Sequence, residues 1–278
     1  MIGPWVPTGP ALLFCPADRP ERYAKALDRA DMVILDLEDA VAPDDKPAAR
    51  QALIDHPLDP ERVLVRINPV GTVDHRADLE ILDEAGYQTV VLAKTETADQ
   101  VFSVGRPVIA QVETPMGAVR CEDIAAAEMC VGMLWGSEDL IDGLGGRSSR
   151  FGADETRPGA YRDVPRFVRA RVRLAAAAFG KTAIDAVYPD IADEAGLARE
   201  VRDAVALGYA ATACIHPSQV PVVRAGYTPT DEEIDRAQRL LDESEKRDGG
   251  VFEFEGSMVD APVFGQAQAV LNRAEGDD

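Results

Sequence analysis

The sequence predicts an α/β protein built as a closed (β/α)8 barrel of the TIM type, followed by a C-terminal helical extension. Three observations lead to this fold. Short apolar, β-rich runs alternate with helical patterns along most of the 278 residues, as in repeated βα units. There are eight such runs, a number that favours a closed barrel over an open sheet. Most of the runs are continuously apolar, as parallel strands covered by helices on their outer face must be.

Helices are expected between the eight apolar runs, the first of them directly after the first run. A helix is expected at about 19–29, and Ala-, Leu- and Arg-rich segments predict helices at 164–180 and 196–208. Gly208 ends the last of these as a C-cap. The expected strands are 11–17, 32–39, 62–68, 89–94, 107–114, 130–139, 182–190 and 211–219.

The C-terminal residues do not continue the βα pattern. We therefore expect a barrel domain at 1–225 and a separate appendage at 226–278. Thr230 precedes Glu233 by three residues, which is the spacing of a capping box at a helix start. The elements expected in the appendage are a helix at 230–248, a short extended stretch at 251–264 and a last helix at 265–274.

Composition excludes several classes of function. A formal net charge of −20 argues against a nucleic-acid-binding protein, because a polyanion requires a basic surface. No run approaches the roughly 20 apolar residues of a membrane span, and no basic segment precedes the first apolar run, so a secretory signal is not expected. The four cysteines have no metal-ligand spacing, and we interpret them as reduced, buried thiols of a cytoplasmic protein.

Polar residues gather at the carboxyl ends of the expected strands. In a barrel of this kind the functional site lies at that end, so we expect these side chains to meet. A ring of salt bridges that seals the barrel is the structural alternative, and Asp36, which lies earlier in its strand, is open to a purely structural role. The residues at strand ends are Asp36, Glu38, Asp39, Arg66, Asn68, Lys94, Glu96, Glu113, Thr114, Glu138, Asp139, His216 and Ser218.

The composition of this end of the barrel favours a magnesium site. Several carboxylates that converge on one opening repel each other unless a cation lies among them. Only three histidines are present, and none has a zinc-ligand pattern with cysteine. Oxygen ligands suit Mg²⁺, which takes one or two protein carboxylates and leaves its other positions to water and substrate. Arg66 would add a fixed positive charge suited to a carboxylate or a developing enolate.

Two further segments could bind anions. Arg19, Arg22, Lys25 and Arg29 share one broad face of the first expected helix; this face either holds a ligand with phosphates or is an ordinary solvated surface. The loop at 143–163 is too long for a simple connection and has the length of a lid or binding loop. Its Arg147 and Arg150 are possible anion contacts.

Seven stretches together resemble the citrate lyase beta-subunit-like proteins of the HpcH/HpaI aldolase superfamily, the branch that includes malyl-CoA and citramalyl-CoA lyases. They occur in order along nearly the whole chain, and their joint occurrence is specific. The stretches are LFCPADRPERYAKAL (13–27), VILDLEDAV (33–41), VRIN (65–68), QVETPMGA (111–118), LWGSEDL (134–140), CIHPSQV (214–220) and FEGSMVDAPV (254–263).

The resemblance implies roles for the residues at the barrel mouth. Glu113 and Asp139 match the Mg²⁺ ligands of the family. Arg66 matches the residue that contacts the acyl carboxylate and the thioester oxygen, and Glu113 also touches the substrate. Glu38 and Asp39 match groups that orient metal-bound water and Arg66.

The resemblance also implies a coenzyme site and a residue shared between subunits. Phe14, Arg19 and Lys25 match positions that hold coenzyme A, which moves the interpretation of the basic helix face towards binding. Asp260 matches the general acid and base, presented across a subunit interface by a neighbour's C-terminal lid. A homo-oligomer, most simply a trimer, is therefore expected.

The reaction implied is a reversible, Mg²⁺-dependent cleavage of a 3-hydroxyacyl-CoA into an acyl-CoA and a 2-oxo acid such as glyoxylate or pyruvate. Three alternatives remain. The protein could act as a citrate lyase beta subunit on an acyl-carrier-protein thioester, or as an aldolase of free oxo acids without coenzyme A. A Schiff-base aldolase would use Lys94, although the carboxylates near it favour a charged, ion-paired lysine.

Overall fold

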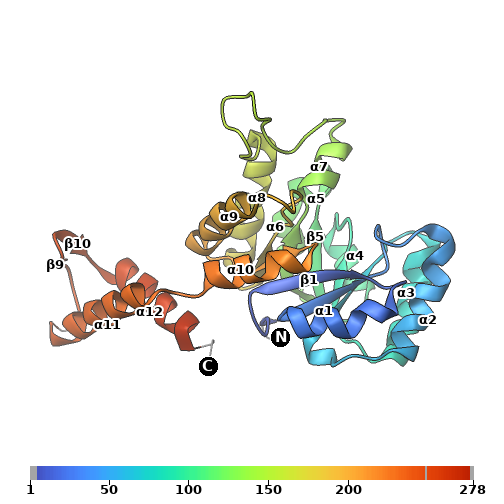
Figure 1. Cartoon of the computed structure of the whole chain (residues 1–278), viewed down its shortest axis with the longest axis horizontal. Coiled ribbons are helices and arrows are strands. Elements are labelled where there is room, and N and C mark those ends of the chain that lie inside the picture. The colour runs from blue at the N-terminus through green and yellow to red at the C-terminus, as the bar shows by residue number, and fades with distance from the viewer. Residues whose placement is uncertain (1–4, 248, 276–278) are drawn as a thin grey trace. The chain divides into compact units, whose positions relative to one another are not determined.

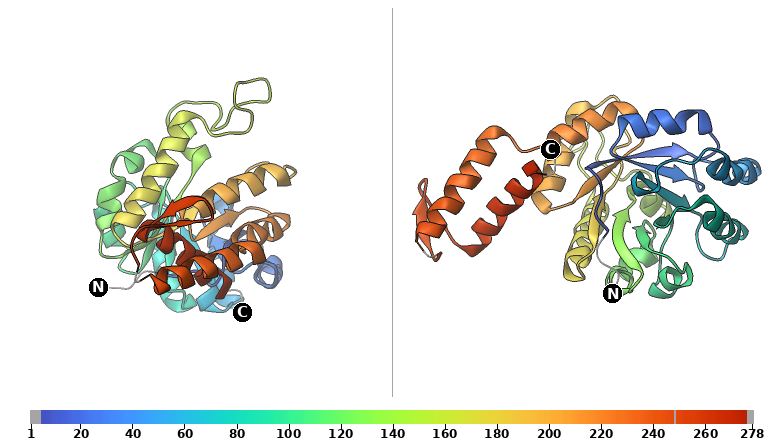
Figure 2. Two further views of the ribbon diagram at one scale, coloured as in Figure 1. Left: turned by 90° about the vertical axis from the view of Figure 1, so that its left-hand side faces the viewer. Right: turned by 90° about the horizontal axis from the view of Figure 1, so that it is seen from below.

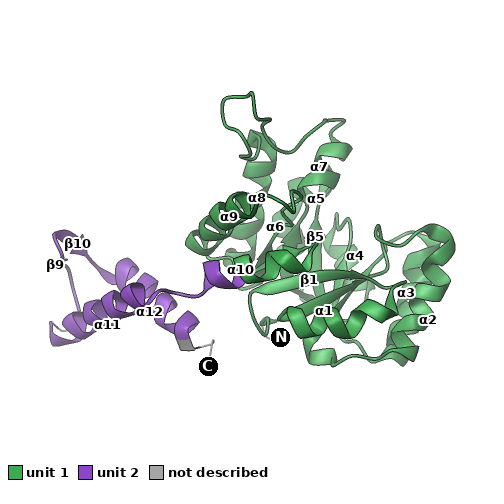
Figure 3. Ribbon diagram, in the orientation of Figure 1, with its two compact units in different colours: residues 1–223 green, residues 224–278 purple. Residues whose placement is uncertain are grey.

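The chain folds into two compact units, residues 1–223 and 224–278 (Figure 3). The computed structural model describes residues 5–247 and 249–275. The division falls inside helix α10 (Val220–Tyr227), two residues before the boundary expected from the sequence. Among the described residues no helix is both long and apolar enough to cross a membrane.

The first unit contains a closed barrel of eight parallel strands, which confirms the predicted fold. The ring closes where β1 pairs with β8, with Leu12 opposite Ala213. Each strand ends between one and five residues before its predicted limit, because the polar residues that follow belong to loops or helix starts. The strands are β1 (Ala11–Pro16), β2 (Met32–Asp36), β3 (Val63–Ile67), β4 (Val90–Leu92), β5 (Val108–Val112), β6 (Cys130–Trp135), β7 (Thr182–Asp185) and β8 (Ala211–Cys214).

Helices lie outside the ring of strands (Figure 2, right). The two long helices predicted from composition are α8 (Asp163–Ala178) and α9 (Glu194–Leu207), and Gly208 ends α9 with a φ of 80°, a left-handed conformation that glycine adopts without strain. The others are α1 (Tyr23–Arg29), α2 (Lys46–Asp55), α3 (Val73–Ala85), α4 (Ala98–Ser103), α5 (Pro115–Val119), α6 (Cys121–Ala126) and α7 (Ser137–Gly143). Short 3₁₀ turns are η1 (Pro20–Arg22), η2 (Pro43–Asp45), η3 (Pro60–Arg62) and η4 (Pro217–Gln219).

The inside of the barrel is packed with aliphatic side chains. One buried cluster takes members from all eight strands, so the barrel is a core and not a channel. The four cysteine thiols are also buried and form no disulfide, as the sequence predicts. The cluster consists of Leu12, Met32, Ile34, Leu64, Val91, Ile109, Val131, Leu134, Ile184, Ala211 and Ala213.

The second unit is a pair of helices joined by a β-hairpin (Figure 1). Thr230 and Glu233 form the predicted capping box at the start of α11 (Asp231–Lys246). Strands β9 (Phe252–Phe254) and β10 (Ser257–Val259) pair antiparallel, and the two turn residues between them, Glu255 and Gly256, both have positive φ, as a tight hairpin turn requires. The last helix, α12 (Ala261–Glu275), begins four residues before the predicted start at 265. Phe252 and Val259 join this unit's own small core.

Candidate active site at the barrel mouth

A buried arginine–aspartate pair forms the floor of the site. Asp36 ends β2 directly opposite Arg66 of β3. The guanidinium donates from Nε to Asp36 Oδ1 over 2.7 Å and from Nη2 to Oδ2 over 2.5 Å, a bidentate geometry that fixes the plane of the arginine. Burial alone would lower the pKa of Arg66, but the Asp36 carboxylate raises it further above its usual range. Arg66 is thus a permanently charged group, and its Nη1 lies 3.3 Å from Glu38 Oε2.

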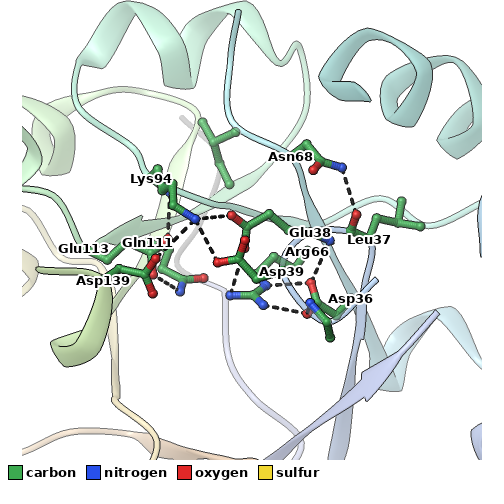
Figure 4. A network of polar contacts seen from close by, with 12 residues as sticks. Asp36, Leu37, Glu38, Asp39, Arg66, Asn68, Lys94, Gln111, Glu113 and Asp139 are labelled. Carbon is green, nitrogen blue, oxygen red and sulfur yellow. Dashed lines mark hydrogen bonds and ion pairs between the residues drawn. The ribbon is translucent and has the colours of Figure 1, made fainter. Parts of the chain in front are cut away.

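A lysine occupies the centre of the remaining carboxylates (Figure 4). Lys94 follows β4 with a φ of 50°, and its ammonium donates to Glu38. It also lies 2.9 Å from Asp39 Oδ2 and 3.3 Å from Asp139 Oδ1. Burial acts to lower the pKa of Lys94, but the hydrogen bonds to Glu38 and Asp39 and the negative charges around it together outweigh this effect, so the pKa is raised. Lys94 is therefore an ion-paired ammonium and is poorly suited to act as a Schiff-base nucleophile.

Glu113, which follows β5, is a buried carboxylate held by two donors. Its Oε1 accepts from the backbone N–H of Lys94 over 2.9 Å, and its Oε2 accepts from Gln111 Nε2 over 2.5 Å. The residue is 1% exposed. Burial, and after it the negative charge of Asp139, raises the pKa of Glu113 to about 8. These two carboxylates therefore oppose each other electrostatically in the absence of a cation.

Asp139 belongs to a helix and not, as the sequence suggested, to the end of a strand. β6 stops at Trp135, and Asp139 lies in the first turn of α7 after the N-cap Gly136. Gly136 has no side chain to fill the space beside Glu113. A Cβ there would lie 2.7 Å from Glu113 Oε2 and 2.9 Å from its Cβ, closer than the two residues could tolerate. The absence of a side chain at Gly136 thus leaves room for the Glu113 carboxylate in the pocket that Asp139 also lines.

The residues present fit a magnesium ion. Glu113 and the partly exposed Asp139 would supply two carboxylate ligands, and Mg²⁺ commonly binds proteins through one or two carboxylates. The described residues contain no group of three or more His, Cys, Asp or Glu that could hold a metal, so water or substrate would complete the coordination. Glu38 Oε2 is buried and lacks a hydrogen-bond partner among the described residues. It is therefore available to a metal-bound water or to a substrate.

Glu113 and Asp139 line a pocket of about 200 Å³. Its other charged residues are Asp36, Arg66 and Glu138, and its apolar lining includes Trp135. Such a mixture is typical of sites in which a few polar groups orient a small ligand. The pocket opens at the end of the barrel where active sites of this fold lie.

The structure separates the three residues expected to hold coenzyme A. Phe14 lies in the mouth pocket, where the Arg66 guanidinium stacks over its ring at 4.8 Å. Arg19 and Lys25 are exposed on η1 and α1 outside the strands. A ligand that touched all three would extend from the mouth over the start of α1. Asp260 is exposed in the second unit, immediately before α12.

Several strand-end residues proposed from the sequence serve local structure. Asn68 donates from Nδ2 to Asp78 Oδ2 over 2.7 Å, which ties β3 to α3. Thr114 caps α5 and donates to Glu96 Oε1 over 2.9 Å, so Glu96 is not a partner of Lys94. His216 caps η4. Glu138 lines the mouth pocket and accepts from Ser137 Oγ over 2.9 Å. The other predicted residues that come together are Asp36, Glu38, Asp39, Arg66, Lys94, Glu113 and Asp139.

Four residues of the site were missed or undervalued by sequence reasoning. Asp36 orients Arg66. Lys94 forms ion pairs with three carboxylates, although sequence reasoning assigned it a role only in the alternative Schiff-base mechanism. Gln111 donates to Glu113, and its place two residues before Glu113 on the same face of β5 could have identified it. Gly136 left no detectable signal, because its importance lies in a contact with a distant residue.

Comparisons with known proteins agree with this site. Residues 11–217 match the HpcH/HpaI aldolase/citrate lyase family, and residues 164–276 match the family described as a carbon–carbon bond lyase of the TIM-barrel fold. A citrate lyase subunit beta-like protein of Mycobacterium tuberculosis is 57% identical over 267 residues, which are 96% of each chain. Mitochondrial citramalyl-CoA lyase of Rattus norvegicus is 33% identical over 298 residues, covering 95% of this chain and 85% of its own.

A solved structure gives the same result for the fold. The crystal structure of protein CitE from Mycobacterium tuberculosis, in complex with magnesium, acetoacetate and coenzyme A, has a TM-score of 0.91 and 56% sequence identity. The similarity covers 96% of this chain and 98% of that one. The resemblance found in the sequence motifs is thus confirmed, and the chain belongs to the HpcH/HpaI aldolase/citrate lyase family of TIM-barrel carbon–carbon bond lyases.

Proposed function

We propose that this protein is a Mg²⁺-dependent lyase and synthase for a 3-hydroxyacyl-CoA. It cleaves malyl-, methylmalyl- or citramalyl-CoA reversibly into an acyl-CoA and a 2-oxo acid, glyoxylate or pyruvate. The observation that carries the proposal is the pairing of Glu113 and Asp139 in one pocket with a fixed arginine. The relatives support it, since one is a citramalyl-CoA lyase and another was crystallised with magnesium and coenzyme A.

The residues of the mouth divide the work of the reaction. Magnesium held by Glu113 and Asp139 would lower the free energy of negative charge on substrate oxygens. Arg66, oriented by Asp36, places a second positive charge where the thioester oxygen becomes an enolate oxygen. Glu38 Oε2, which has no hydrogen-bond partner among the described residues, accepts the proton of the substrate hydroxyl group. Lys94 holds the Glu38 and Asp39 carboxylates in place through its ion pairs with them.

Cleavage requires one proton to leave and one to arrive. The hydroxyl gives its proton to Glu38 as the carbon–carbon bond breaks. The former hydroxyl carbon becomes the carbonyl carbon of the 2-oxo acid, and the bonding electrons form the thioester enolate. Asp260 then gives a proton to the enolate carbon. In synthesis Asp260 removes that proton from the acyl-CoA. We propose that Asp260 reaches the site from the C-terminal lid of a neighbouring copy in a trimer.

Binding of the coenzyme would use the start of the first helix. Arg19 and Lys25 are exposed cations in a chain of net charge −20, and phosphates are the natural partners of such groups. Phe14 lies between this helix and Arg66, where it can contact the pantetheine arm near the thioester. The buried thiols fit the cytoplasmic location expected from the sequence.

A direct assay tests the proposal. Purified protein is incubated with acetyl-CoA or propionyl-CoA and with glyoxylate or pyruvate, with Mg²⁺ or EDTA, and the thioesters are identified by mass spectrometry. We expect a hydroxyacyl-CoA from one pair, formed only with the metal. Glu113→Gln should abolish it, because it removes a ligand charge while keeping the hydrogen bond from Lys94 N–H. No product from any pair, with Mg²⁺ shown to bind by calorimetry, would contradict the proposal.

Two alternatives predict different outcomes in the same assay. A citrate lyase beta subunit would be inactive on free CoA esters and active on an acyl-carrier-protein thioester. A free-acid aldolase would keep its activity when Arg19 and Lys25 are both replaced by glutamate. The exposed cations of the first helix favour the CoA-dependent reaction over this second alternative.

A further inference from the structure

A second pocket, which we call the arginine pocket, lies between α8, α9 and the loop that precedes α8. It has a volume of about 470 Å³ and shares no lining residue with the mouth pocket. The residues that carry positive charge into it are Arg150, Arg157, Arg166, Arg169 and Arg199.

The charge of this lining is opposite to that of the protein. The chain contains 49 acidic and 29 basic residues, so an ordinary surface hollow should carry more carboxylates than bases. The arginine pocket has five arginines against two carboxylates, Glu200 and Asp203. Two other surface hollows follow the overall composition, with two carboxylates to one base and four carboxylates to three bases. A hollow with excess positive charge in so acidic a chain requires a specific explanation.

Two of the arginines form a rigid wall. Arg150 donates to both oxygens of Glu200 over 2.6 and 2.9 Å, and its guanidinium stacks on Tyr161 at 3.8 Å and near Tyr188 at 4.6 Å. Arg169 is buried and pairs with Asp185 over 2.7 Å. Because their charges are already matched by carboxylates, these two arginines shape the pocket and supply little free charge.

The other three arginines are accessible and poorly compensated. Arg157 and Arg166 share a single carboxylate, that of Asp163, over 2.8 and 3.1 Å, and such exposed pairs are weak and screened by salt. Arg199 is exposed and makes no ion pair within 4 Å in the described part of the chain, and its charge contributes to lowering the pKa of Asp193. Asp203 also lines the pocket and pairs with Arg169, whose charge Asp185 already matches. Three guanidinium groups therefore face two carboxylates, those of Asp163 and Asp203, which leaves about one positive charge at the rim.

We propose that the arginine pocket binds a small phosphate-bearing anion that is distinct from the coenzyme. Guanidinium forks match the oxygens of phosphate in pairs and hold them better than lysine ammonium groups do. The surplus positive charge and the exposed guanidinium groups suit a small anion such as a phosphate monoester or pyrophosphate. We call the surface of Phe14, Arg19 and Lys25 the coenzyme face. None of these three residues lines the arginine pocket, so the proposed ligand would contact none of the residues assigned to coenzyme A.

Isothermal titration calorimetry with pyrophosphate in EDTA tests this proposal. The titration uses the full chain carrying Arg19→Glu and Lys25→Glu, so that the coenzyme face cannot hold the probe. We expect one saturable site, which Arg199→Glu weakens at least tenfold. The matched control is Arg202→Glu on the same helix, an exposed arginine that does not line the pocket, and it should change the affinity less than twofold.

Coenzyme A itself serves as the second probe, because its phosphates could in principle fill the same pocket. Arg199→Glu introduced into the wild-type chain should leave the affinity for coenzyme A unchanged. A parallel loss of coenzyme affinity would make the arginine pocket part of the coenzyme site and overturn the proposal. So would a lack of pyrophosphate binding in the double variant, or binding there that Arg199→Glu does not affect. None of these results depends on lyase turnover.

Discussion

Gly136 of the candidate active site cannot be replaced by a larger residue without a clash. Gly136 has an ordinary extended backbone, so an alanine there would be unstrained by itself. Its Cβ, however, would lie 2.7 Å from Glu113 Oε2 and would displace that carboxylate. We expect Gly136→Ala to weaken Mg²⁺ binding about 10–100-fold, as changes around metal ligands commonly do. Calorimetric titration with Mg²⁺ measures this, with Gly265→Ala, which meets nothing within 4 Å, as the control; equal affinities would refute it.

Glu113 should couple metal binding to pH. Burial and the charge of Asp139 raise its pKa to about 8 in the metal-free protein, against about 4.3 in an unfolded chain. The folded state therefore holds an extra proton between these values, and the metal-free protein loses stability as the pH rises through about 8.

Binding of Mg²⁺ at pH 7 must displace that proton. We expect nearly one proton to be released per Mg²⁺ bound at pH 7 and almost none above pH 9, with affinity rising between the two. Calorimetry in buffers of different ionisation enthalpy measures the release. Constant affinity from pH 6 to 9 would show that Glu113 is already ionised without metal.

The sequence allowed a site residue to be predicted when it belonged to a recognisable motif or stood at the end of an expected strand. Glu113, Arg66 and Asp139 lie in such motifs. Lys94 was difficult because its three carboxylate partners come from the loop after β2 and from the start of α7, and only the closed barrel brings them together. The role of Gly136 could not be predicted from the sequence, because the need for a glycine there arises from the close packing of Glu113 against it.

At the level of elements, a buried ion pair attaches α8 to the barrel. Arg169 pairs with the buried Asp185 at the end of β7, which also accepts from Trp135 Nε1 over 2.7 Å. On its other side Arg169 pairs with Asp203 of α9, whose side chain is 57% exposed.

The two carboxylates should differ strongly in their effect on stability. Asp185→Ala leaves a buried guanidinium and an indole N–H without their partner, and we expect the free energy of unfolding to fall by about 3–5 kcal/mol. Asp203→Ala removes an exposed partner and should cost less than about 1 kcal/mol. Urea denaturation compares them, and similar losses for both variants would contradict the assigned difference.

The order and type of the elements could be predicted well, but their ends could not. Eight strands followed from alternation of apolar runs, and the start of α11 followed from its capping box. The motif at 130–139 was taken as one strand, whereas Gly136 interrupts it and α7 begins at Ser137. An apolar run followed by acids is compatible with either outcome, because hydrogen bonding to the neighbouring strands decides where a strand stops.

At the level of the whole molecule, the two units perform separate tasks in the proposed mechanism. The barrel unit contains the metal ligands and Arg66, and the second unit contains Asp260. The second unit has a small core of its own, and the sequence indicated it through the break in the βα pattern. The sequence alone gave no sign of the number of copies, because an interface is a property of two surfaces and not of a periodic pattern.

Mixed oligomers can establish whether Asp260 serves a neighbouring barrel. Asp260→Ala chains retain an intact barrel, and Glu113→Gln chains retain an intact lid; each variant alone should be inactive. If the lid acts between copies, co-expression of the two in equal amounts should restore activity to about a quarter of the sites, because half of the barrels are intact and half of those meet an intact lid. Differently tagged chains purified in succession provide the mixed species for the assay. Complete inactivity of the mixture, with both chains present, would instead place Asp260 over the barrel of its own chain.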